Sequence, residues 1–177
     1  MDFKHRIALF SAPLLIGLGI LLVFQSQSLT KARLIFCDVG QGDGMLLETG
    51  TKQVVVDGGP GTKIVDCLSA KMPFWDRTVE MIVLTHPQRD HMEGLIAVLE
   101  RYEVKTVVTT NVVNKTKIFD EWQKVVEAEG AKVHVPDIGD QLVINRGSTP
   151  LGVEPLSLQI LWPSRSDINQ WRDDPPS

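Results

Sequence analysis

The feature that most constrains the fold is a strand-like segment that leads directly into a helix-like segment and then into another strand. Glu80–Thr85 contains four consecutive apolar residues and is typical of a buried strand. From Asp90 onward, apolar residues recur at helical spacing, and Val104–Thr109 is again strand-like. A β-α-β unit places its two strands side by side in a parallel sheet, with a right-handed crossover.

Further elements flank this unit on both sides. Upstream, glycine-containing turns separate three short apolar runs, which predicts an antiparallel meander. The chain thus begins with a meander and continues with alternating helices and strands, and this order indicates an α/β (α+β) sheet domain. The predicted strands are 32–38, 45–48, 53–56, 80–85, 104–109, 132–135, 141–144 and 156–161, and the predicted helices are 62–70, 90–99 and 118–129.

The N-terminus carries an uncharged apolar run from Ile7 to Phe24, preceded by Lys4 and Arg6. As a helix it would be about 27 Å long, close to the hydrocarbon thickness of a bilayer. The basic residues before it predict a single-pass anchor in the cytoplasmic membrane, with the rest of the chain outside the cytoplasm. A cleaved signal peptide and a buried core helix are the alternatives. The resulting division is 1–24 anchor or signal segment, 25–31 linker and 32–177 domain.

Charge and cysteine content narrow the function classes. The chain has 18 basic and 22 acidic residues. An acidic domain does not hold nucleic acid by charge alone, although a metal-centred nuclease remains compatible with it. Cys37 and Cys67 lack metal-binding spacing, so buried thiols are the default interpretation, and a disulfide is the alternative for an exported domain.

His86, Asp90 and His91 lie on the loop between the central strand and its helix. Imidazole and carboxylate groups that converge at one loop are typical ligands of a metal ion such as Zn²⁺. In the alternative interpretation, Asp90 only caps the helix, because Glu93 follows it at the spacing of a capping box.

Two further aspartates accompany turns. Asp43 lies in the glycine-rich turn Gly40–Gly44, which is otherwise an ordinary hairpin turn and lacks the spacing of a phosphate-binding loop. Asp57 ends a valine-rich strand, where it either forms a turn or orients a ligand histidine.

Three motifs make the region from Arg33 to Ser177 similar to the metallo-β-lactamase-like domain of the ComEC family of DNA-uptake competence proteins. They occur in the family's order and at its spacing. Leu161-Trp162-Pro163 resembles the strand end that precedes the second half of that domain. The motifs are residues 36–43 (FCDVGQGD), 55–60 (VVDGGP) and 84–95 (LTHPQRDHMEGL).

The resemblance implies an αβ/βα sandwich with a metal site at the sheet edges. His86 would hold a first metal position, Asp90 and His91 a second, and Asp43 and Asp57 would lie nearby. Gln88 replaces the second histidine of the family motif His-x-His-x-Asp-His, which favours one ion over two and makes Mn²⁺ an alternative to Zn²⁺. The implied chemistry is hydrolysis by a metal-activated water, with Asp90, Asp57 and Asp43 as the catalytic carboxylates.

The family's second half supplies a further aspartate and histidine, and we expect the present chain to be an incomplete N-terminal part of the domain. The first hypothesis is a membrane-anchored phosphodiesterase that acts on DNA during uptake. The second is a non-catalytic accessory of DNA uptake or an inactive fragment, and a hydrolase of another ester is a third. Expected partners are the membrane, DNA, and the remainder of the domain or a ComEC-like channel.

Overall fold

The computed structural model describes residues 16–17, 19, 32–110, 112–144, 156–162, 164 and 166–167. The chain divides into two units, Met1–Lys31 and Ala32–Ser177, and the sheets and the helices that cover them belong to the second unit. The predicted anchor and linker, residues 1–31, lie outside the described residues apart from Ile16, Gly17 and Gly19. Among the residues that the structure describes, no helix is long and apolar enough to cross a membrane.

A six-stranded mixed sheet forms the centre of the second unit, with the strand order β1-β2-β3-β5-β7-β8. The first three strands are the antiparallel meander expected from the glycine-containing turns, and β3, β5, β7 and β8 run parallel. The strands are β1 (Ala32–Phe36), β2 (Gly44–Thr49), β3 (Lys52–Gly58), β5 (Met81–Leu84), β7 (Thr106–Thr109) and β8 (Lys132–His134).

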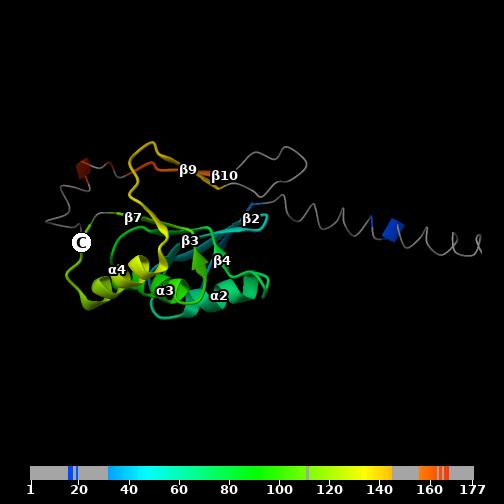
Figure 1. Cartoon of the computed structure of the whole chain (residues 1–177), viewed down its shortest axis with the longest axis horizontal. Coiled ribbons are helices and arrows are strands. Elements are labelled where there is room, and N and C mark those ends of the chain that lie inside the picture. The colour runs from blue at the N-terminus through cyan, green and yellow to red at the C-terminus, as the bar shows by residue number, and fades with distance from the viewer. Residues whose placement is uncertain are drawn as a thin grey trace, which may run out of the picture. The chain divides into compact units, whose positions relative to one another are not determined.

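Three helices cover one face of this sheet (Figure 1). They are α2 (Lys63–Lys71), α3 (Arg89–Leu99) and α4 (Lys117–Glu129). Because side chains alternate along a strand, every second residue of the central strands joins the core beneath the helices. Val55, Ile82 and Val107 occupy this core together with Leu95 of α3 and Trp122 of α4.

The opposite face packs against a hairpin of β9 (Gln141–Ile144) and β10 (Leu156–Gln159), as Figure 1 shows. Val54, Met81 and Val108, which alternate with the residues of the first core, form a second buried cluster with Ile144. A separate two-residue ladder joins β4 (Thr78–Val79) to β6 (Glu103–Val104). The unit therefore has a helix layer, a sheet and a hairpin layer.

The mixed α/β class expected from the sequence is confirmed, with three helices and a mixed sheet among the residues described. One local alternative is wrong. The helix α3 begins at Arg89 with Gln88 as its N-cap and has no side-chain capping bond, so Asp90 does not cap it. Glu93 instead binds Arg89, one turn earlier, because the long guanidinium reaches it at the i,i+4 spacing.

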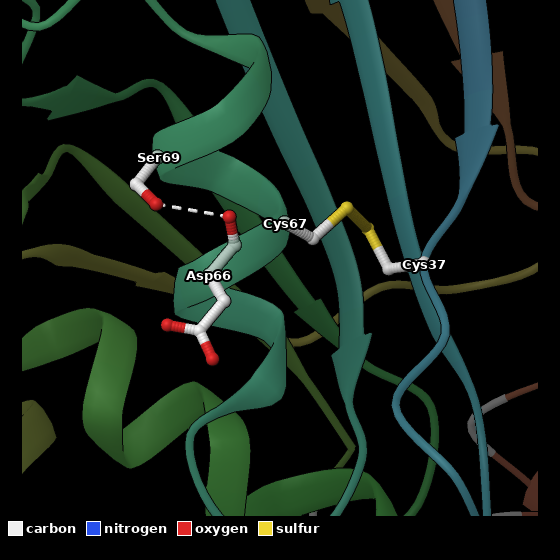
Figure 2. The surroundings of a disulfide bond; sticks show 4 residues. All are labelled: Cys37, Asp66, Cys67 and Ser69. Atoms are coloured by element: carbon white, nitrogen blue, oxygen red, sulfur yellow. Dashed lines mark hydrogen bonds between the residues drawn. A yellow bond between two sulfur atoms is a disulfide. The ribbon is translucent and has the colours of Figure 1, made fainter.

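Cys37 and Cys67 form a disulfide, so the default interpretation of two buried thiols is wrong. The bond joins the chain just after β1 to the middle of α2 (Figure 2). Their Cα atoms are 5.9 Å apart, a separation typical of disulfides. Asp66 and Ser69 lie away from the bond in Figure 2, and the Ser69 hydroxyl donates to the Asp66 backbone carbonyl. The disulfide ties the loop that leads to Asp43 to the helix layer.

Candidate metal centre

Three chain segments meet where the parallel strands β3 and β5 end. Asp57 is the next-to-last residue of β3, Thr85 directly follows β5, and His91 lies in the first turn of α3. Because parallel strands point the same way, their carboxyl ends and the following loops share one edge of the sheet. The glycine-rich loop that carries Asp43 comes from between β1 and β2 and reaches the same edge.

Glycines make this meeting possible, because they remove side chains from two points of backbone contact. A Cβ atom on Gly94 would lie 2.0 Å from the carbonyl oxygen of Gly58, so α3 rests directly on the end of β3. A Cβ atom on Gly42 would lie 1.9 Å from the carbonyl oxygen of Asp90, so the glycine-rich loop rests on the start of α3. Both contacts bring the residues next to these glycines, Asp57 and Asp43, toward His91.

Asp57 is buried, with 1% of its surface exposed, and it has a positive φ of 53°. This left-handed conformation is uncommon outside glycine, although aspartate is among the residues that tolerate it. Oδ1 accepts the backbone N–H of Thr85 at 2.9 Å, and Oδ2 accepts the Thr85 hydroxyl at 2.6 Å. Oδ2 also lies 2.9 Å from Nδ1 of His91. These contacts hold the carboxylate in place. The surrounding structure thereby keeps the Asp57 backbone in a left-handed conformation that is costly by itself.

The contact with Asp57 determines the hydrogen position on His91. A carboxylate only accepts hydrogen bonds, so Nδ1 of His91 carries the ring proton and donates a hydrogen bond to Oδ2. In the neutral ring, Nε2 then keeps its lone pair. This arrangement, in which a carboxylate orients an imidazole and leaves the other nitrogen free, is the usual second shell of a metal-binding histidine. Asp57 was expected either to form a turn or to orient a ligand histidine, and its hydrogen bond with His91 is the one expected of an orienting partner.

Asp43, Asp57 and His91 each offer a ligand-type atom within 4.8 Å of the others. Asp43 is exposed, whereas Asp57 and His91 are buried, so the group opens to solvent on the Asp43 side. The ring of His86 lies beside that of His91, with centroids 3.9 Å apart. Two imidazoles suit a borderline cation such as Zn²⁺, and an accessible carboxylate also suits a harder ion such as Mn²⁺, so the donor set fits a divalent metal ion.

The structure brings together four of the five residues singled out from the sequence: Asp43, Asp57, His91 and, by ring contact, His86. Asp90 is half-buried, contacts the glycine-rich loop through its backbone, and is not part of the carboxylate–histidine group found among the described residues. The individual ligand and catalytic roles stay predictions.

Thr85 is the residue that sequence reasoning missed. Its backbone and its hydroxyl both bind Asp57, and the hydroxyl lies 3.0 Å from Nδ1 of His86. A threonine at a strand end is ordinary, so its type carries no signal. Its place directly before His86 was the available hint.

Neighbouring polar contacts fix the loop and the first turn of α3. The Asn114 amide donates to the carbonyl oxygen of Pro87 at 2.6 Å, which ties the histidine loop to the segment after β7. Both guanidinium contacts of Arg89 with Glu93 are 3.0 Å long. Hydrogen bonding by Arg89 lowers the pKa of the Glu93 carboxyl, and the same contact raises the pKa of Arg89. Arg89 is thereby engaged on the surface of α3.

No protein-family model matches the chain, and no curated protein matches it either. Among solved structures, it is similar to the metallo-β-lactamase fold protein YhfI from Bacillus subtilis, with 15% identity and a TM-score of 0.44. That match covers 66% of this chain and 48% of the Bacillus protein, about half of its length. A candidate metallo-β-lactamase from Thermotoga maritima is similar at 13% identity, with a TM-score of 0.40 and coverage of 73% and 68%. With TM-scores below 0.5, the ComEC resemblance and the complete αβ/βα sandwich stay predictions.

Proposed function

We propose that this domain binds one divalent metal ion and is a metal-dependent hydrolase. The carrying observation is the group Asp43, Asp57 and His91, whose ligand-type atoms lie within 4.8 Å of one another at the carboxyl end of the sheet. In the proposal, Asp43 and the Nε2 atom of His91 are ligands, and His86 adds the second imidazole. Asp57 orients His91 and already accepts three hydrogen bonds.

The division of labour between the two carboxylates follows from burial. Asp57 is enclosed and already accepts three hydrogen bonds from Thr85 and His91, so its role is to maintain the geometry of the histidine. Asp43 is exposed and lies on a loop, so it faces any substrate that approaches the edge of the sheet. A divalent ion, when bound, supplies an activated water and stabilises negative charge on a phosphate or carbonyl oxygen.

The finer proposal is a ComEC-like phosphodiesterase outside the cytoplasmic membrane, with DNA as substrate. The three motifs that resemble that family support the family resemblance, and the substrate class follows from that resemblance alone. The disulfide between Cys37 and Cys67 supports the location, since disulfides persist mainly in oxidising compartments.

The test starts with metal binding by the purified full chain. Zn²⁺ and Mn²⁺ affinities are measured calorimetrically for the wild type and for His91→Ala, Asp43→Asn and His134→Ala. Losing an orienting partner typically costs 10–100-fold in metal affinity, so His91→Ala, which removes a ligand, is expected to cost at least about 100-fold. His134→Ala is the matched control, because His134 lies on β8 and pairs with Asp140 at 3.3 Å.

Hydrolysis is assayed next with single-stranded DNA, with an activated phosphodiester, and with a lactone and a thioester. Metal-dependent cleavage of both phosphodiesters supports the finer proposal, and cleavage of the lactone or thioester alone replaces the substrate class. Stoichiometric metal without any hydrolysis makes the domain a metal-binding module. Absence of metal binding by the wild type overturns the proposal as a whole.

A further inference from the structure

Thr85 lies between the buried carboxylate of Asp57 and the ring of His86. Its hydroxyl oxygen is 2.6 Å from Oδ2 of Asp57 and 3.0 Å from Nδ1 of His86. Its backbone N–H donates to the other carboxylate oxygen, Oδ1, which fixes the threonine against Asp57 at two points. The hydroxyl is therefore held between the Asp57 carboxylate, which can only accept a hydrogen bond, and Nδ1 of His86.

Counting protons gives each of these contacts a direction. The carboxylate has no proton to donate, and the hydroxyl has only one. If the hydroxyl donated to His86, two acceptor oxygens would face each other at 2.6 Å without a proton between them. The Thr85 proton therefore points to Asp57, and the hydroxyl oxygen accepts a hydrogen bond from Nδ1–H of His86.

The consequence for His86 is the same as for His91. Each neutral ring carries its proton on Nδ1 and keeps the lone pair of Nε2, which is the atom a metal ion would bind. Asp57 imposes this state on His91 directly and on His86 through one hydroxyl. One buried carboxylate thus orients two histidines on two different elements of the chain.

We infer that Thr85 is a positioning residue that fixes the Nδ1–H tautomer of His86 and so presents its Nε2 atom for ligation. The tautomer is a property of the metal-free chain. Its effect on metal affinity rests on the proposed metal-binding function.

The matched variants are Thr85→Val, which keeps the shape and removes the hydroxyl, and Thr85→Ser, which keeps the hydroxyl. Long-range ¹H–¹⁵N correlation spectra of the metal-free full chain, recorded well above the ordinary histidine pKa, report the tautomer of each ring. The chain has four histidines, so single substitutions assign the signals. Circular dichroism confirms that each variant is folded.

The expected result is Nδ1–H for both His86 and His91 in the wild type and in Thr85→Ser. In Thr85→Val, His86 is expected to shift toward the Nε2–H form, whereas His91 stays unchanged because Asp57 still accepts its proton. His91 is therefore an internal control that a merely structural disturbance would also alter. For metal affinity, we expect a 10–100-fold loss in Thr85→Val and a change of less than about threefold in Thr85→Ser.

Nε2–H on His86 of the wild type overturns the inference without any variant, and so does an unchanged His86 tautomer in folded Thr85→Val. Failure of Thr85→Ser to keep the wild-type tautomer also contradicts it. If the tautomers behave as expected but the wild type binds no metal, the proposed function fails and the positioning role stands. If metal binds while His86 carries Nε2–H, the positioning role of Thr85 fails and the proposed metal-binding function stands.

Discussion

Nδ1 of His91 lies 2.9 Å from Oδ2 of Asp57, although the two residues are 34 positions apart in the chain. Both side chains are buried, with exposed fractions of 8% for His91 and 1% for Asp57. A hydrogen bond to a charged acceptor that is shielded from water is stronger and more directional than one on the surface. This contact sets the orientation of the imidazole at the candidate metal centre.

Asp57→Asn is expected to disrupt this orientation. The asparagine amide must point its NH₂ group either at the Thr85 backbone N–H or at the hydrogens of Thr85 and His91, and both orientations oppose donors. We expect a loss of about 1–3 kcal/mol in the free energy of unfolding. Metal affinity is expected to fall about 10–100-fold. Chemical denaturation and metal titration measure the two effects.

Asp66→Asn is the control for this substitution, since Asp66 is an exposed residue of α2 in the same unit. It is expected to leave metal affinity unchanged. Equal losses in the two variants would contradict the role of Asp57.

Gly94→Ala is expected to separate α3 from β3. The added Cβ atom would lie 2.0 Å from the carbonyl oxygen of Gly58, and backbone cannot move aside as a flexible side chain can. Overpacking of this kind costs about 1–3 kcal/mol, and we expect the upper end of that range. Since His91 lies one turn before Gly94, weaker metal binding should accompany the loss. Thermal unfolding and metal titration are the measurements.

Gly130→Ala is the control for Gly94→Ala, because it introduces backbone strain without a steric clash. Gly130 has open space around the position of a Cβ atom, but its φ is +68°. Its substitution is expected to cost about 1 kcal/mol through backbone strain alone and to leave metal affinity intact. A cost for Gly94→Ala no larger than this would argue against the close contact.

Removing the disulfide by a Cys37→Ala, Cys67→Ala double substitution is expected to destabilise the domain by about 2–4 kcal/mol, because the unfolded chain gains freedom. Metal affinity should fall several-fold, since Cys37 begins the loop that carries Asp43. The melting temperature is measured with and without a reductant. Reductant should lower the melting temperature of the wild type and leave that of the variant unchanged, and an insensitive wild type would contradict the bond.

Glu93→Gln tests the pH dependence of the contact with Arg89. Hydrogen bonding by Arg89 lowers the pKa of Glu93 below its usual value of 4.5. The contact therefore stabilises the fold above that usual value, and the contribution disappears as the pH falls through the lowered pKa. Wild type and variant should differ slightly in melting temperature near neutral pH and converge in acid. A difference that persists in strong acid would have another origin.

Much of the secondary structure follows from local patterns. Residues 141–144 are predicted as a strand and form β9, and the helix predicted at 118–129 differs from α4 by one residue. Apolar periodicity marks these elements because one of their faces is buried. The strand β4 was not predicted, since two residues are too few to display a period. The predicted strand 104–109 is divided in the structure between the end of β6 at Val104 and β7.

The candidate site divides differently. From the sequence, His86, Asp90 and His91 indicate metal chemistry, because they are imidazole and carboxylate groups on one loop between a strand and a helix. Asp43 and Asp57 are expected only to lie near that loop. The sequence predicts Asp90 as a metal ligand. Among the described residues, however, it is the backbone of Asp90, packed against Gly42, that contributes to the site.

The sequence by itself determined most of the strands and helices and predicted which side chains carry metal-ligand chemistry, since both depend on side-chain type and nearby spacing. Only the tertiary structure decided that Asp57 orients His91, that Thr85 stands between Asp57 and His86, and that Cys37 joins Cys67. These relationships depend on how closely the backbones approach. The contact of Gly58 with Gly94 shows that this approach is set by packing between elements far apart in the chain.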